Sequence, residues 1–233
     1  MQDSTLDRRQ MFAVGAALAA AVPAAASAAA PAPPPPVSKF APKPLPFDPK
    51  AVPGLSEKLL VSHHDNNYVG AVTRLGAITS AFAALDPATA PVFTLNGLKR
   101  EELIAWNSMI IHELYFACLG APTRPGASLA RAIERDFGSD TRWRAEFTGM
   151  GKALGGGSGW VLLQWSHRDS RLVNQWAADH TMTLAGATPI LALDMYEHAY
   201  HMDFGSRAAA YVDAYMGALN WTAADAVFAK ASA

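Results

Sequence analysis

Apolar residues recur at helical spacing over the first long stretch of the folded sequence. They mark one face between residues 55 and 85, and Pro53-Gly54 and Asp86-Pro87 flank that stretch. A period near 3.6 residues with breakers at both ends predicts one long helix. The same spacing continues from Lys99 to Cys118, and Gly120 follows as a stop signal. Two long helices joined by a short loop favour an antiparallel hairpin.

The pattern changes after the second helix. Two shorter helical stretches precede three apolar runs of strand length, and helical spacing returns from about residue 198 to 215, with a last helix after Asn220-Trp221. The expected elements are helices at 129–137 and 141–154 and strands at 160–165, 171–177 and 190–193. We therefore expect an α+β fold, in which an N-terminal long antiparallel helical hairpin precedes a mixed domain with a small three-stranded antiparallel sheet flanked by helices.

The first 46 residues differ from the rest in composition. Thirteen of residues 1–36 are Ala and six are Pro, and no acidic side chain occurs between Asp7 and Asp48. Arg8-Arg9, the apolar run that follows and Ala26-Ser27-Ala28 have the order of a secretory signal with a twin-arginine pair. This pattern predicts a signal peptide over 1–28 and export to the periplasm or beyond. An Ala-rich tail on a cytoplasmic protein is the alternative.

Domain organisation follows from these patterns. We expect a Pro/Ala-rich linker over 29–46, a helical-hairpin domain over 47–122 and an α/β C-terminal domain over 123–233. The apolar run of the signal has twelve residues, whereas a bilayer span needs about 20. We therefore expect no permanent membrane anchor.

Charge and cysteine content narrow the function classes. The 233-residue chain is 17% charged with a formal net charge of −1, and no block of like charge occurs in it. Electrostatic nucleic-acid binding is therefore not expected. Cys118 is the single thiol, which excludes an intrachain disulfide and any Cys-rich zinc module. Seven histidines remain as the main source of site chemistry.

The sharpest local pattern is a carboxylate and an imidazole four residues apart, Asp194 and His198, where a predicted buried strand ends. Together they offer a hard oxygen and a borderline nitrogen to a metal. Alone, the pair is also explained by Asp capping the next helix and His bonding a backbone carbonyl. His63 and His112 add two imidazoles inside the apolar runs of the two long helices. Burying four polar groups is costly unless a common partner satisfies them.

These residues resemble the iron/manganese superoxide dismutase family over Leu55 to Lys230. The resemblance rests on ordered motifs along this stretch: Leu55-Ser56-Glu57 through His63-His64-Asp65 to Val72-Thr73-Arg74-Leu75, Trp106-Asn107 with His112-Glu113-Leu114-Tyr115-Phe116, Gly157-Ser158-Gly159-Trp160, Asp194-Met195-Tyr196-Glu197-His198-Ala199-Tyr200, and Asn220-Trp221. It implies that one Fe or Mn ion per subunit is bound. The implied ligands are His63, His112, Asp194 and His198, two from each domain.

The resemblance also assigns the surroundings of the metal. The residues it places around the ligands are His180, Asn67, Tyr68, Trp160 and Tyr200. His180 falls where the family has a Gln or His beside the metal-bound solvent, although a one-residue shift would put Asp179 there. Glu197 is expected at a homodimer interface, reaching the ligand His of the partner subunit.

The match departs from the family at the substrate gateway. The family has a His and a Tyr four and eight residues after the first ligand, where this chain has Asn67 and Ala71. An alternative register makes His64 and Tyr68 the gateway pair, but it puts Leu60 at the ligand position. We prefer the first register because it keeps the metal site complete.

The implied activity is the disproportionation of two superoxide anions and two protons to oxygen and hydrogen peroxide. Such chemistry needs a metal that cycles by one electron, which zinc cannot do. One alternative is a metal-binding or structural family member with weak or no activity because the gateway is altered. A zinc-dependent hydrolase with the same ligands is another, and the choice between Fe and Mn stays open.

Overall fold

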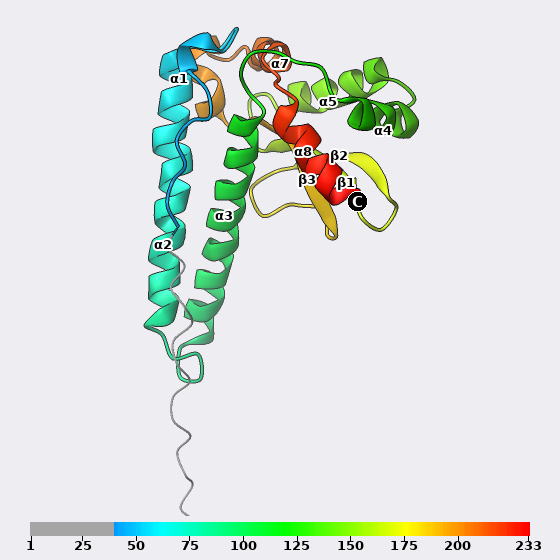
Figure 1. Ribbon diagram of the computed structural model, residues 1–233. Helices are drawn as coiled ribbons and strands as arrows, with labels where there is room; N and C mark the ends of the chain where they lie inside the picture. The colour runs from blue at the N-terminus through cyan, green and yellow to red at the C-terminus, as the bar shows by residue number, and fades with distance from the viewer. Residues whose placement is uncertain (1–39) are drawn as a thin grey trace, which may run out of the picture. The chain divides into compact units, whose positions relative to one another are not determined.

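The computed structural model describes residues 40–233, which form two long helices and a small sheet with its covering helices (Figure 1). The expected signal peptide, residues 1–28, lies outside the described residues, as do the first residues of the expected linker. From Phe40 onward the linker segment packs against the core through Phe40, Leu45 and Phe47. Among the described helices, none combines the length and apolar character that crossing a membrane requires.

The N-terminal hairpin is built from two helical arms. The first arm consists of α1 (Glu57–Ser62), the stretch η2 (His63–Tyr68) and α2 (Val69–Ala83), and the second is α3 (Val92–Ala117). A short helical turn, η1 (Pro49–Ala51), precedes them. The two arms run side by side in Figure 1, as the predicted hairpin requires. The second arm begins seven residues before the predicted start at Lys99.

The early start of α3 has a simple reason. Val92 and Phe93 form its first turn, yet their side chains are 81% and 78% exposed. Apolar residues that face solvent do not extend the amphipathic pattern of the helix, so apolar spacing did not predict that the helix begins at Val92.

The first arm is continuous but not uniform. Ser56 caps it, its Oγ accepting a hydrogen bond from the backbone N–H of Leu59 at 3.1 Å. Over His63–Tyr68 the backbone is a π-helix, in which one extra residue widens the turn. The widened turn rotates the residues before it relative to those after it. Because consecutive residues of a helix project in different directions, His63 and His64 reach different parts of the molecule.

The C-terminal domain contains the predicted three-stranded sheet. Helices α4 (Ala127–Phe137) and α5 (Asp140–Ala153) precede the strands β1 (Trp160–Ser166), β2 (Arg171–Ala177) and β3 (Ala187–Asp194). The strand order is β2-β1-β3, and both pairs are antiparallel. All residues of the central strand β1 are buried. The predicted fold class is therefore confirmed.

The third strand begins three residues earlier than predicted and contains Pro189. Pro189 is paired with Gln164 where the β1–β3 register shifts. A proline is tolerated there because an irregularity removes the need for its missing N–H.

The predicted single helix from about 198 to 215 is wrong. The structure has three shorter pieces: η3 (Glu197–Ala199), α6 (His201–Phe204) and α7 (Ala208–Gly217). Gly205 ends α6 with a φ of 56° and a ψ of −131°, a backbone conformation outside any helix. The last helix, α8 (Thr222–Ala231), follows Trp221 as predicted.

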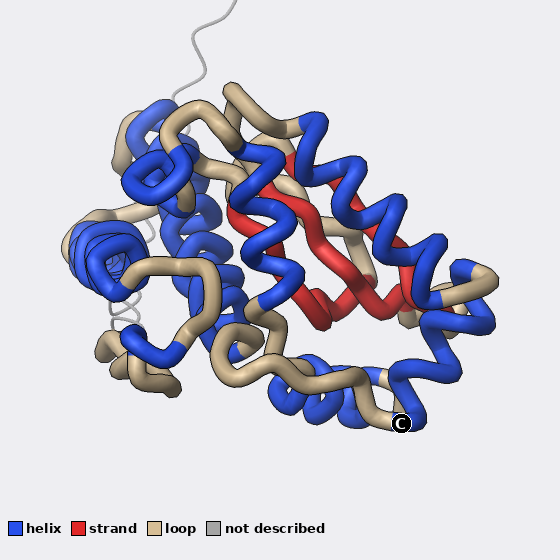
Figure 2. The backbone as a smooth tube through the Cα atoms, turned by 90° about the horizontal axis from the view of Figure 1, so that it is seen from above, coloured by secondary structure: helices blue, strands red, loops and turns tan. Residues whose placement is uncertain are grey.

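The sheet is covered by helices, and the hairpin joins it at one edge. Figure 2 shows helices lying across the strands, and the packing pairs are α5 with β1, α4 with β2 and α8 with β3. The second arm, α3, also contacts β3. One apolar core cluster runs through both parts, from Leu59 and Leu60 on the first arm to Leu193 on β3. This shared core fixes the end of β3 against the part of the hairpin remote from its connecting loop.

Candidate metal centre

Four side chains from distant parts of the chain converge where the hairpin meets the end of β3. They are the four expected ligands: His63, His112, Asp194 and His198, and we call them the ligand cluster. One potential ligand atom from each lies within 4.8 Å of the others. The first three residues are buried, and the side chain of His198 is 26% exposed.

The three imidazoles surround one carboxylate oxygen. Oδ2 of Asp194 lies 3.0 Å from Nε2 of His63, 3.2 Å from Nε2 of His198 and 3.5 Å from Nε2 of His112. Metal–ligand bonds of about 2.1 Å separated by angles of about 90° to 120° would hold donor atoms about 3.0 to 3.6 Å apart. The three distances to Oδ2 of Asp194 fall in that range, so this oxygen and the three imidazoles are spaced as ligands of a single ion.

Hydrogen bonds outside the cluster orient its members. Nδ1 of His112 donates to the backbone carbonyl of Ser108, one turn earlier on α3, at 2.7 Å. This leaves Nε2 of His112 unprotonated, and that buried atom has no hydrogen-bond partner among the described residues. Oδ1 of Asp194 accepts from the backbone N–H of Tyr196 at 2.8 Å, so that Oδ2 is the oxygen turned to the imidazoles. Such outer contacts fix ring orientation in metal sites.

The protonation states also suit a cation. Burial lowers the pKa of His63 and lowers that of His112 to about 3, so both rings are neutral near pH 7. Burial alone would raise the pKa of Asp194, but His198 and His63 outweigh it and hold that pKa below its ordinary range. A carboxylate and neutral imidazoles are the ligand types that redox-active Fe and Mn accept.

His63 and His64 reach different surroundings, which bears on the choice of register. Nε2 of His64 bonds the backbone carbonyl of Lys43 at 2.8 Å, and its Nδ1 lies 2.7 Å from Oδ1 of Asp65. His63 is the member of the pair that the structure brings to Asp194. The alternative ligand position, Leu60, is a fully buried core residue.

Tyr68 and Tyr200 lie away from the ligand atoms. The hydroxyl of Tyr68 accepts from the backbone N–H of Lys43 at 2.8 Å and donates to Glu113 at 3.0 Å. With His64 it lines an apolar cavity of about 460 Å³ behind Phe116, whose ring packs against His63. Tyr200 stacks on Tyr211 in the core.

His180 and Trp160 lie beside the ligand cluster. Nε1 of Trp160 donates to Nδ1 of His180 at 2.9 Å, and the Trp160 ring meets the ring of His112 edge-on at 5.1 Å. Burial lowers the pKa of His180, so its neutral ring carries the proton on Nε2. The His180 ring also stacks on Tyr196 at 4.9 Å. Asp179 instead caps its own turn by accepting from Thr181.

A polar cavity leads toward this side of the cluster. It has a volume of about 230 Å³ and is lined by Asn66, Asn67, Gly70, Ala71, Arg74, Ile104, Ala105, Ser108 and His180. Both preferred gateway residues, Asn67 and Ala71, therefore face it, whereas His64 and Tyr68 line the other cavity. Arg74 was not among the predicted site residues. Arg74 lies three residues after Ala71 and seven after Asn67, so helical spacing places all three on one face, and this spacing could have identified it.

Comparison with known proteins gives one consistent result. Residues 125–227 match the family model described as "Iron/manganese superoxide dismutases, C-terminal domain". "Superoxide dismutase [Fe]" of Cupriavidus metallidurans is 67% identical over 189 residues, which cover 81% of this chain and 96% of that protein. "Superoxide dismutase [Mn] 1" of Halobacterium salinarum is 32% identical over 189 residues, which cover 79% of this chain and 92% of that protein. "Superoxide dismutase [Fe]" of Aquifex pyrophilus is 30% identical over 191 residues, which cover 78% of this chain and 88% of that protein.

Proposed function

The chain belongs to the iron/manganese superoxide dismutase family, and on that premise we propose that the ligand cluster holds the single Fe or Mn ion of the active site. The chain is a superoxide dismutase, which converts two superoxide anions and two protons into one O₂ and one H₂O₂. The observation that supports the placement of the ion is the convergence of three Nε2 atoms on Oδ2 of Asp194, at 3.0 to 3.5 Å.

A bound Fe or Mn ion would supply one-electron redox chemistry between two oxidation states. The side chains supply the rest. Asp194 contributes negative charge to the site, and the carbonyl of Ser108 keeps the proton of His112 on Nδ1. His180, held through Nδ1 by Trp160, carries an N–H on Nε2 that can bond an anion or solvent beside the ion. The rings of Phe116 and Trp160 exclude bulk water.

The direct test is superoxide consumption after rapid mixing, measured on protein of known metal content. We expect the rate to rise in proportion to bound iron or manganese and to vanish in His112→Ala. A protein that binds redox metal without consuming superoxide would be the inactive family member that the altered gateway allows. Zinc binding with hydrolase activity would contradict the proposal.

We propose iron as the metal. The 67% identical relative is named as an iron enzyme, whereas the relatives near 30% identity include both iron and manganese enzymes. Reconstitution of the metal-free protein with each ion separately tests this choice. Activity recovered with iron alone supports it, and activity recovered with manganese alone contradicts it.

We propose a homodimer joined near the metal site. Glu197 is exposed and adjoins His198, and within the described chain no hydrogen bond reaches Nδ1 of His198. A second subunit that presents its Glu197 would satisfy that nitrogen and orient the ring. Light scattering after size exclusion should give the mass of two chains. Glu197→Gln should weaken the dimer, and a monomeric wild-type protein would contradict the proposal.

We propose export by the twin-arginine route, which the paired Arg8 and Arg9 support. Replacing both by Lys keeps the charge but removes the pair, and should leave the precursor in the cytoplasm. Unchanged yield outside the cytoplasm would contradict the assignment.

A further inference from the structure

The polar cavity beside His180 has an exposed end and a buried end. Ser108 and Ala105 form its buried side at 6% and 1% exposure, while Arg74 at the other end has a side chain that is 56% exposed. Ser108 also contacts His112, its Oγ lying 3.3 Å from Nδ1. The cavity therefore connects solvent near Arg74 with the immediate neighbour of a cluster histidine.

Arg74 differs from the other residues that line this cavity. Asn66, Asn67 and Ser108 are neutral polar residues, His180 is a neutral imidazole, and the rest are Gly or apolar. Among the described residues that line the cavity, Arg74 is thus the only one with a fully charged side chain. Arg74 forms an ion pair with Glu101 on α3. Glu101 lies seven residues before Ser108, which is about 10 Å along the helix axis.

Glu101 forms ion pairs with two arginines. It accepts from Arg74 and also lies 3.2 Å from Nη1 of Arg100, so two cations share one carboxylate. Glu101 does not line the cavity, whereas Arg74 does. An anion in the cavity is therefore nearer to the guanidinium than to the carboxylate that partly neutralises it.

We propose that Arg74 is a specificity-determining residue that draws small monovalent anions into this cavity, with Glu101 setting the strength of the attraction. The proposal rests on the proposed function for superoxide as the natural anion and for the bound iron on which azide reports. A cation at the mouth compensates for a gateway in which Asn67 and Ala71 carry no charge. Clefts lined by one sign of charge raise the local concentration of an oppositely charged substrate.

The test compares charge-neutralising variants at low ionic strength. A unit charge about 8 Å away in water changes the local concentration of a monovalent anion by about two-fold. Arg74→Gln should therefore lower kcat/KM for superoxide about two-fold. It should also raise the dissociation constant of azide by a similar factor, as measured by optical titration of the iron-loaded protein. Arg74→Lys should restore both values. Glu101→Gln should raise kcat/KM and lower the dissociation constant of azide. All these differences should disappear in 0.5 M salt, where the Debye screening length is about 4 Å.

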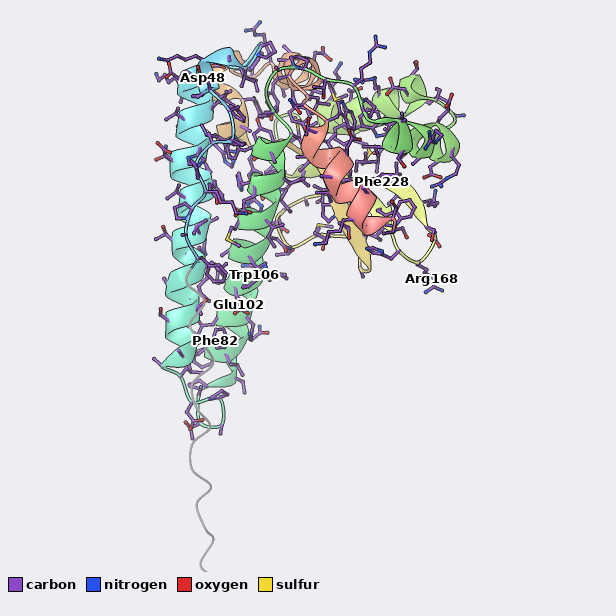
Figure 3. All side chains as sticks on the ribbon, viewed as in Figure 1. Asp48, Phe82, Glu102, Trp106, Arg168 and Phe228 are labelled. Carbon is purple, nitrogen blue, oxygen red and sulfur yellow. The ribbon has the colours of Figure 1, made fainter. Side chains whose placement is uncertain are left out.

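Arg168 provides the matched control. It lies at the tip of the turn between β1 and β2, far from the hairpin (Figure 3), and Arg168→Gln removes the same charge from the chain. Equal effects of Arg74→Gln and Arg168→Gln would overturn the proposal, because net charge would then explain them. Losses of the same sign in Arg74→Gln and Glu101→Gln would also overturn it, because they would indicate a merely structural ion pair. The azide measurement needs no turnover, so it separates failure of this proposal from failure of the proposed function.

Discussion

Oδ2 of Asp194 lies 3.0 Å from Nε2 of His63, although 131 positions separate the two residues along the chain. One comes from the end of β3 and the other from the π-helical stretch of the first arm. Both residues are buried, at 1% exposure or less. The shared apolar core brings the two segments together, and the site is a consequence of that packing.

His63 and His64 should differ in their effect on metal binding. His63→Ala removes a donor atom of the ligand cluster, so metal affinity should fall by ten-fold or more, about 1.4 kcal/mol of binding free energy for each factor of ten, and the metal retained per chain should drop. His64→Ala breaks only contacts to Lys43 and Asp65 and should leave the metal content unchanged. Elemental analysis after dialysis measures both. Metal lost from His64→Ala and kept in His63→Ala would overturn the assignment of the first ligand.

Trp160 should act on the reaction through His180. Trp160→Phe keeps an aromatic ring but removes the N–H that His180 accepts, so the imidazole is free to change tautomer. Loss of such an orienting contact typically costs about 10- to 100-fold in metal-site function. We expect kcat/KM to fall and its pH profile to shift. Trp165→Phe on the same strand is the control and should leave the pH profile unchanged.

Gly159 should be intolerant of a side chain. Its φ is 134°, and a Cβ there would lie 2.1 Å from the carbonyl oxygen of Ala177. Its own carbonyl accepts from Met195, next to Asp194. Gly159→Ala should therefore lower the free energy of unfolding by at least about 2 kcal/mol and reduce metal content. Gly149→Ala on α5 meets nothing within 4 Å and should be neutral or slightly stabilising in thermal unfolding.

The protein should lose stability in alkali. Burial raises the pKa of Cys118 to about 12, whereas an unfolded thiol ionises near pH 9. Between these values the unfolded chain binds fewer protons than the folded one, so stability falls as pH rises, by up to about 1.4 kcal/mol per pH unit for this group. Denaturant titrations at pH 8 to 11 measure the slope. Cys118→Ala should flatten it, and an equal slope in both proteins would show that the buried thiol contributes nothing.

The elements that the sequence predicts well are those whose pattern is amphipathic or fully buried. The strand at Trp160–Ser166 is buried throughout because helices cover it, and the apolar positions Leu59, Leu60, Val72 and Leu75 of the first arm follow one helical face. Gly205 broke a predicted helix, because a glycine in a periodic pattern does not reveal its φ. The first turn of α3 was hidden because Val92 and Phe93 face solvent.

The four members of the ligand cluster were named from spacing and family resemblance, and the structure brings them together. The surroundings were harder to predict. Tyr68 is four residues from His64, and this spacing and the likeness to the family's His and Tyr made the pair the alternative gateway, but both line the apolar cavity. Periodicity assumes 3.6 residues per turn and cannot register one inserted residue. Arg74 escaped notice for a different reason: a single Arg on a helix is ordinarily a solvated side chain.

Elemental analysis of the purified wild-type protein, set beside its rate of superoxide consumption, shows whether the ligand cluster holds a redox-active metal. We expect one iron or manganese ion per chain and a rate that scales with that content. Stoichiometric zinc, or full activity in protein that holds neither iron nor manganese, would contradict this expectation.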